Sequence, residues 1–164
     1  STRLARELGQ DAVVVQRMRT AGLLHDIGKV AIPQSLLNKP GRLTTEEFAK
    51  LMPHPVVGWE ICKPLRTAQS VLDCILYHHE RFDGCGYPHG LAGEDIPYQA
   101  RLLAVADALD ALTSERAYRR SLSVAEAVEL LGHETDSGKW DPEIFAALTR
   151  LADRGQADPR RLEL

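Results

Sequence analysis

The sequence is poor in aromatic residues, cysteine and long apolar runs, and each shortage excludes a class of protein. Aromatic residues make up only 5% of the 164 residues, and β-branched residues do not alternate as they do in strands. Three cysteines without CxxC spacing argue against a disulfide framework or a thiolate zinc site. No apolar run is long enough to cross a membrane. We therefore expect a cytoplasmic globular domain without a membrane segment.

The chain also lacks an excess of positive charge. Its 20 Lys and Arg residues face 23 Asp and Glu residues, which leaves a net charge of −3 with His neutral. Without a global basic field, a nucleic acid polymer is not an expected partner, and any affinity for phosphate must be local. The 44% hydrophobic and 26% charged residues are typical of one folded domain of this length.

Apolar residues recur at helical spacing, so the fold class that we predict is all-α. We expect loops over residues 32–43 and 83–97, where glycines and prolines gather. The domain is expected to span residues 1–153, followed by a polar tail over residues 154–164. Helices are predicted over residues 4–8, 12–26, from 44 or 45 onward, 56–62, 70–80, 98–112, 123–132 and 141–151.

Four of the six histidines occur where a plain helix favours other residues. His78 and His79 are adjacent in the predicted helix 70–80, where each continues an apolar stripe toward the core. His25 follows an apolar helix, and His54 lies between two prolines. A lone histidine of this kind is usually a core residue satisfied by hydrogen bonds. The alternative is a set of metal ligands.

Two acids favour the metal. Asp107 lies in the apolar helix 98–112, where a buried carboxylate needs either a core arginine or a metal ion. Asp26 follows His25 directly. Imidazole and carboxylate donors without cysteine suit iron, manganese, zinc or nickel better than calcium. A carboxylate such as Asp26 can bridge two ions about 3.5–4 Å apart, as in two-metal hydrolases.

Three cations near these ligands suggest a phosphate-containing substrate. Lys29 lies one short turn past Asp26, and Arg116 and Arg119 follow the helix that carries Asp107. Guanidinium pairs bind phosphate and guanine edges in a fork geometry. The alternative for the arginines is a solvated helix face.

Two motifs, His25-Asp-Ile-Gly-Lys29 and His78-His-Glu-Arg-Phe-Asp-Gly-Cys-Gly-Tyr-Pro88, closely resemble those of the HD-GYP family. Its members are bacterial signal-transduction phosphodiesterases of the HD superfamily that hydrolyse cyclic di-GMP. The resemblance covers residues 4–151 and implies a compact helical bundle with the GYP loop (residues 83–97) between helices.

The resemblance also implies a site and its chemistry. It implies two or three divalent metal ions, iron or manganese, with zinc, nickel or magnesium as alternatives. Asp26, Lys29 and Asp107 are the implied catalytic residues, and the implied products are pGpG and GMP. GGDEF-domain proteins are implied partners at the GYP loop. The implied metal ligands are His25, Asp26, His54, His78, His79 and Asp107, and the implied contacts to the cyclic dinucleotide are Lys29, Tyr87, Arg116 and Arg119.

One feature of the family has no counterpart in this sequence. The family's first ligand histidine lies on an opening helix, upstream of the position of Ser1. We therefore expect a domain that lacks this helix, cut from a longer protein with an N-terminal sensory or receiver domain. A cyclic di-GMP receptor or protein-interaction module without catalysis is the alternative function. Another HD-superfamily nucleotidase, acting on a mononucleotide or guanosine tetraphosphate, is a further one.

Overall fold

The structure, a computed structural model, describes residues 1–115 and 120–158, and this part of the chain is helical without strands. The all-α prediction is therefore confirmed. No helix in these residues is long and apolar enough to cross a membrane. The α-helices and 3₁₀ helices (η) are α1 (Thr2–Glu7), α2 (Ala12–Leu24), η1 (Ile27–Ala31), α3 (Gln34–Leu37), α4 (Thr45–Leu51), α5 (His54–Cys62), η2 (Lys63–Leu65), α6 (Gln69–Tyr77), η3 (Gly93–Asp95), α7 (Tyr98–Thr113), α8 (Val124–Asp136) and α9 (Pro142–Asp153).

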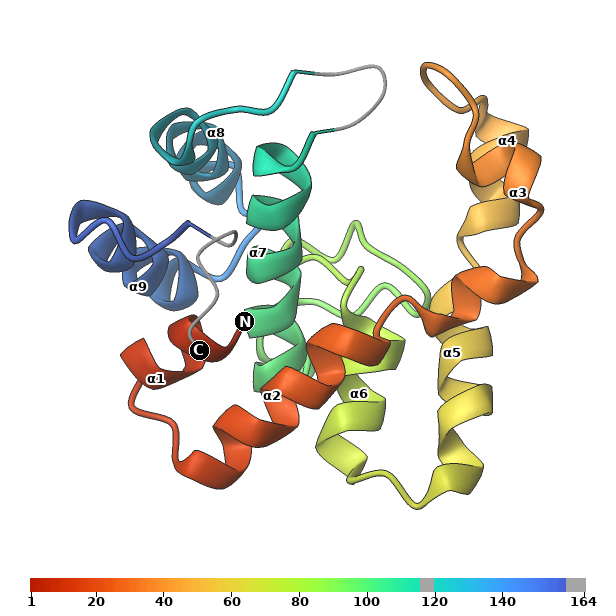
Figure 1. Cartoon of the computed structure of the whole chain (residues 1–164), viewed down its shortest axis with the longest axis horizontal. Helices are drawn as coiled ribbons and strands as arrows, with labels where there is room; N and C mark the ends of the chain where they lie inside the picture. Colours follow the sequence, from red (N-terminus) through yellow and green to blue (C-terminus); the bar gives the residue numbers. More distant parts are fainter. Residues whose placement is uncertain (116–119, 159–164) are drawn as a thin grey trace.

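Helix α7 is the axis of the bundle (Figure 1). Helices α2 and α6 pack on one side of it, and α8 and α9 pack on the other, with α1 closing the bundle against α2 and α9. Helix α5 lies against α6 and η1. Residues 34–51, which we call the α3–α4 arm, extend away from the bundle beyond α5 (Figure 1).

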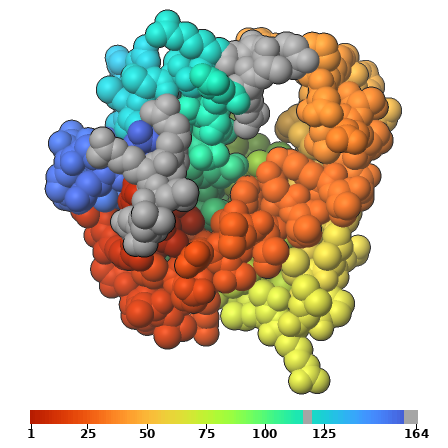
Figure 2. All heavy atoms as spheres, in the orientation of Figure 1, coloured from red at the N-terminus to blue at the C-terminus, as the bar shows by residue number. Residues whose placement is uncertain are grey.

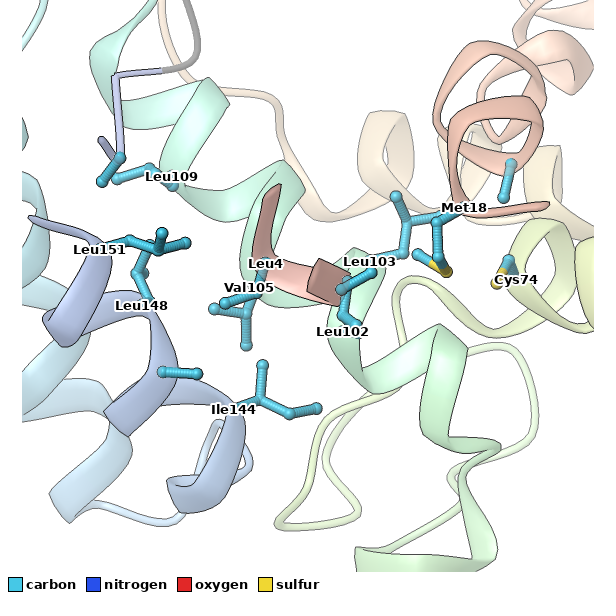
Figure 3. Packing of buried hydrophobic residues seen from close by; sticks show 14 of the residues in the cluster. Leu4, Met18, Cys74, Leu102, Leu103, Val105, Leu109, Ile144, Leu148 and Leu151 are labelled. Atoms are coloured by element: carbon cyan, nitrogen blue, oxygen red, sulfur yellow. The ribbon is translucent and has the colours of Figure 1, made fainter. Parts of the chain in front are cut away.

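The hydrophobic core follows α7 (Figure 3). Leu102, Leu103 and Val105 of this helix are almost fully buried, and they meet side chains from both halves of the bundle. Burying each such side chain contributes about 1.5–3 kcal/mol to folding. The core therefore fixes α7 relative to α2, α6 and α9. The core residues labelled from these three helices are Met18, Cys74, Ile144, Leu148 and Leu151.

Polar caps start several helices where the sequence predicted them. Thr44 caps α4 in a capping box with Glu47, and Ser123 caps α8 in the same way with Glu126. The Asp141 side chain accepts hydrogen bonds from the first turn of α9 and also pairs with Arg101 of α7 at 2.6 Å. This last contact ties the start of α9 to the central helix.

Three local predictions were wrong. The expected loop 32–43 contains the short helix α3, which begins after Pro33 because proline suits the entry to a helix. Helix α5 already begins at His54, since Pro55 is tolerated in its first turn. Helix α6 ends at Tyr77, so His78 and His79 lie in the turn after it rather than within it.

The approach of η1 to α5 is close enough to require glycine. A Cβ atom at Gly28 would lie 1.9 Å from the His54 carbonyl oxygen and 2.6 Å from the Gly58 nitrogen. Both atoms belong to the α5 backbone, which cannot rotate away. Gly28 therefore sets the spacing between Asp26 and His54, which lie on either side of this contact.

We predict that Gly28→Ala lowers the free energy of unfolding by about 3 kcal/mol, because the overlap with backbone forces η1 and α5 apart. Denaturant unfolding measures the change. Gly22→Ala is the control, since its Cβ would meet only the Ser1 hydroxyl at 3.1 Å. Equal stability of Gly28→Ala and the unchanged chain would contradict the close approach.

We also predict that Asp141→Asn costs about 2–4 kcal/mol of stability. The amide keeps the helix cap but leaves the Arg101 charge, whose side chain is 13% exposed, without its partner. Thermal or denaturant unfolding checks this value against Asp136→Asn, which neutralises an exposed carboxylate on α8. A loss no larger than that of the control would show that the buried pair is dispensable.

Candidate metal centre

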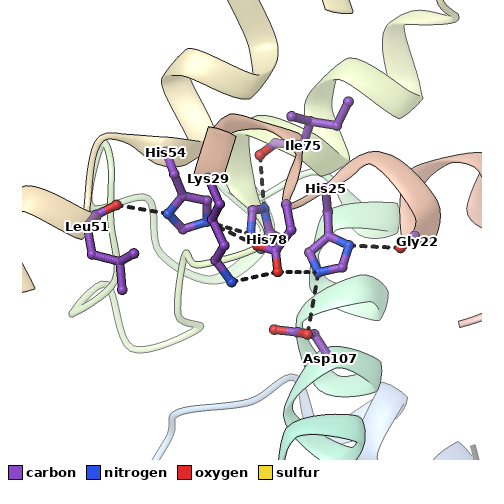
Figure 4. A network of polar contacts seen from close by, with 9 residues as sticks. Gly22, His25, Lys29, Leu51, His54, Ile75, His78 and Asp107 are labelled. Carbon is purple, nitrogen blue, oxygen red and sulfur yellow. Dashed lines mark hydrogen bonds and ion pairs between the residues drawn. The ribbon is translucent and has the colours of Figure 1, made fainter. Parts of the chain in front are cut away.

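Helix ends and one mid-helix residue bring the candidate ligands together (Figure 4). His25 is the C-cap of α2 and His78 the C-cap of α6, whereas His54 opens α5. Asp26 follows α2, and Asp107 projects from the middle of α7. Side chains distant in sequence thus converge where four elements meet.

Three of the histidines are oriented by the same local hydrogen bond. The Nδ1 atoms of His25, His54 and His78 each lie 2.9 Å from the carbonyl oxygen three residues earlier in the chain. A carbonyl oxygen only accepts, so each Nδ1 carries the proton and donates it. In a neutral ring, Nε2 then presents its lone pair toward the centre, as a metal ligand requires.

The centre would be repulsive without a cation. The Nε2 atoms of His54 and His78 lie 3.4 Å apart, and Asp26 Oδ1 is 3.3 Å from the first and 3.9 Å from the second. This Oδ1 is buried and has no hydrogen-bond partner among residues 1–115 and 120–158. Together with His79, the four ligand atoms lie within 4.8 Å of one another. The donor set and its spacing fit a transition metal such as iron, manganese or zinc.

Burial keeps two of these rings neutral. It lowers the pKa of His79 to about 3, with the neighbouring His54 adding to the effect. Burial, reinforced by His79 and His25, also lowers the pKa of His78 well below its ordinary value. Neutral rings are the form that binds metal, so no proton has to leave them at neutral pH.

A second group of ligands lies on the other side of the Asp26 carboxylate. His25 Nε2 is 3.5 Å from Asp26 Oδ2 and 3.5 Å from Asp107 Oδ1. Burial opposes protonation of His25, but the hydrogen bond to Asp107 and the charge of Asp26 raise its pKa overall. The two oxygens of Asp26 therefore face different ligand groups, so this carboxylate could be shared by two ions.

Lys29 completes this side of the centre. Its Nζ lies 2.6 Å from Asp26 Oδ2 and is held by one turn of η1. Burial alone would raise the pKa of Asp26, but the close approach of His54 and the hydrogen bond from Lys29 hold it well below its usual range. Asp26 is consequently ionised throughout the neutral range, and Lys29 places a positive charge beside it.

Tyr87 of the GYP loop forms the remaining wall. Its ring stacks on His79 with the centroids 4.9 Å apart, and its other neighbour is the edge of Phe48 from the α3–α4 arm. Burial, together with the charges of Asp26 and Asp107, raises the pKa of the Tyr87 phenol. The hydroxyl therefore stays protonated and available as a hydrogen-bond donor.

The centre is buried on one side and open on the other. His54 and His78 have no exposed side-chain surface, whereas about a third of the Asp26, Asp107 and Lys29 side chains is accessible. Figure 2 shows a hollow in the surface between the α3–α4 arm and the green helix α7.

The structure brings together all six predicted ligands, with Lys29 and Tyr87 beside them. Arg116 and Arg119 lie outside the described residues. His89 and His133, which match no ligand position of the resemblance, are exposed. The sequence analysis missed Glu80, a buried carboxylate that accepts three backbone hydrogen bonds. Its signal was a charged residue directly after two inward-facing histidines.

Comparisons with known proteins agree with this geometry. The sequence profile of the HD domain family matches residues 1–144. The cyclic di-GMP phosphodiesterase PA4108 of Pseudomonas aeruginosa is 44% identical over 148 residues, which are 90% of this chain and 35% of that protein. The 3′3′-cGAMP-specific phosphodiesterase 1 of Vibrio cholerae is 36% identical over 147 residues, 90% of this chain and 34% of its own. The chain thus spans about a third of these relatives.

A solved structure gives the same result for the fold. Bd1817, described as an HDG"Y"P protein from Bdellovibrio bacteriovorus, superposes with a TM-score of 0.74 at 29% identity, covering 92% of this chain and 48% of its own. The family match covers most of the chain, and the helical bundle superposes on that of the solved protein. The chain therefore belongs to the HD domain family, and within it to the HD-GYP proteins.

Proposed function

We propose that this domain hydrolyses cyclic di-GMP at a centre of two or three divalent metal ions, iron or manganese, and releases pGpG or GMP. One observation carries the proposal. The buried Oδ1 of Asp26 has no hydrogen-bond partner among the described residues and lies beside the Nε2 atoms of His54 and His78, an arrangement that a bound cation would make favourable. The names of the relatives support a cyclic dinucleotide as the substrate.

The candidate ligands divide into two groups around Asp26. His54, His78 and His79 would hold one ion with Oδ1, and His25 and Asp107 would contribute to a second with Oδ2. Bound ions would supply Lewis acidity and lower the pKa of coordinated water. Asp107 lies at the open side, where its carboxylate can orient a water molecule.

The residues on the open side fit a phosphodiester. Lys29 carries a positive charge within 2.6 Å of Asp26 and is about one-third exposed, so it can hold a phosphate oxygen next to the centre. Tyr87 offers a protonated hydroxyl from the opposite wall. Arg116 and Arg119 remain predicted contacts to the dinucleotide.

The wider roles also remain predictions. They include the domain boundary at residue 153, the cytoplasmic location, an N-terminal sensory or receiver domain and GGDEF-domain partners at the GYP loop.

We predict that the chain, purified without oxygen and loaded with Fe²⁺ or Mn²⁺, binds at least one ion per chain and cleaves cyclic di-GMP. Elemental analysis gives the metal content, and chromatography of the nucleotides gives the product. Asp26→Asn should lose both properties, because the amide removes the shared negative charge. A panel with 3′3′-cGAMP tests the choice of dinucleotide.

Three results would count against this function. Absence of metal binding would contradict the metal centre itself. Metal and cyclic di-GMP binding without turnover would identify a receptor instead of an enzyme. Faster cleavage of 3′3′-cGAMP than of cyclic di-GMP would keep the chemistry and change the substrate.

Two aspartates of α7 offer a matched comparison. We predict that Asp107→Asn weakens Mn²⁺ binding at the second group by about 10-fold or more, since a ligand charge beside His25 is lost. Asp110→Asn, one turn further along the same helix, should change it by less than about 2-fold. Calorimetric titration measures both, and equal effects would place Asp107 outside the ligand set.

A further inference from the structure

We infer that Tyr87 is a positioning residue for the ligand His79, and that Glu80 anchors the loop that holds Tyr87 in place. The inference rests on the proposed function, because it concerns a ligand of the proposed metal centre. It assigns the GYP loop a role in metal binding that is separate from contact with substrate.

The four histidines differ in what holds their rings in place. The rings of His25, His54 and His78 are each fixed by a hydrogen bond from Nδ1 to a carbonyl oxygen of their own segment. No hydrogen bond to the ring of His79 is found in the part of the chain that the structure describes. Something other than a hydrogen bond must therefore set the orientation of this ring.

Ring packing supplies that restraint. The Tyr87 ring stacks on the His79 ring at an interplanar angle of 29° and a centroid distance of 4.9 Å. On its other sides His79 meets the rings of His54 at 5.0 Å and His78 at 4.1 Å. Those two rings are themselves fixed by their hydrogen bonds. Of the three rings that surround His79, Tyr87 is thus the one that belongs to the GYP loop.

The backbone holds Tyr87 over His79. The Tyr87 N–H donates to the His79 carbonyl oxygen at 3.2 Å, so the two residues are joined through main chain as well as through their rings. At Gly86 a Cβ atom would lie 2.4–2.6 Å from backbone atoms of residues 79–81, which shows how closely the loop folds back. The edge of Phe48 supports the Tyr87 ring from the α3–α4 arm.

Glu80 fixes the part of the loop that follows Tyr87. Its carboxylate accepts the N–H groups of His89 at 2.7 Å and Gly90 at 3.1 Å through Oε1, and that of Leu91 at 3.1 Å through Oε2. The residue is only 2% exposed, so these charge-assisted bonds form away from water. Because Glu80 follows His79 directly, its carboxylate ties residues 89–91, which follow Tyr87 in the loop, to the segment that carries the ligand.

Replacing Glu80 by glutamine would disrupt these hydrogen bonds while keeping the shape of the side chain. A glutamine amide presents one oxygen and one NH₂ group, so at least one backbone N–H would face another donor. The loop would then relax, and the stack of Tyr87 on His79 would loosen. Outer partners that orient ligands typically change metal affinity by about 10–100-fold when they are removed.

The test is a Mn²⁺ titration of the full chain by calorimetry, in the absence of nucleotide. We expect Tyr87→Leu and Glu80→Gln each to weaken binding by about 10-fold or more. Tyr87→Phe keeps the ring and loses only the hydroxyl, so its Mn²⁺ affinity should stay within about 2-fold of the original. Glu94→Gln neutralises an exposed carboxylate of the same loop and should also stay within that limit.

Stability controls separate positioning from general damage. Asp141→Asn neutralises another buried carboxylate, remote from the histidines, and should lower the melting temperature while leaving Mn²⁺ affinity unchanged. If Tyr87→Leu and Glu80→Gln bind Mn²⁺ like the unchanged chain, the inference is overturned and the proposed function stands. If the unchanged chain binds no Mn²⁺, the proposed function fails instead. Should Glu80→Gln not fold, the contrast between Tyr87→Leu and Tyr87→Phe decides alone.

Discussion

The candidate metal centre depends on an unfavourable contact between electron-rich side-chain atoms. The Nε2 atoms of His54 and His78 and one carboxylate oxygen of Asp26 are held within 4 Å of each other, largely away from water. Packing elsewhere in the bundle has to hold them there, because they do not attract one another. A bound cation turns the same contacts into attraction.

Two features of the packing hold Asp26, His54 and His78 together. The contact at Gly28 brings the segment after α2 onto the start of α5, which places Asp26 beside His54. The core around α7 then fixes α6 and hence His78 against them. Close packing thus lies next to unfavourable polar contacts, as is common where surrounding structure holds a strained functional site in place.

The convergence of these side chains could be predicted from sequence because their chemistry conflicts with their surroundings. Asp107 in an apolar helix and His78 at the end of an apolar stripe both need a partner, and the family signatures supplied the rest. The end of α6 and the start of α5 were not predicted. After α6 the chain turns into a loop whose backbone bonds to Glu80 are tertiary, and α5 begins within a proline pair. The stack of Tyr87 on His79 likewise depends on tertiary folding of the loop.

The position of the α3–α4 arm has a consequence for how this domain diversifies. The arm leaves the bundle after η1 and returns at α5, and those two points are pinned to each other at Gly28. Phe48 and Leu51 at the end of the arm contact Tyr87 and His54, so they are tied to the histidines. Changes in residues 34–47 alter the outer part of the arm and leave these contacts in place. Evolution, or an engineer, can vary that part while the chemistry beneath it is inherited intact.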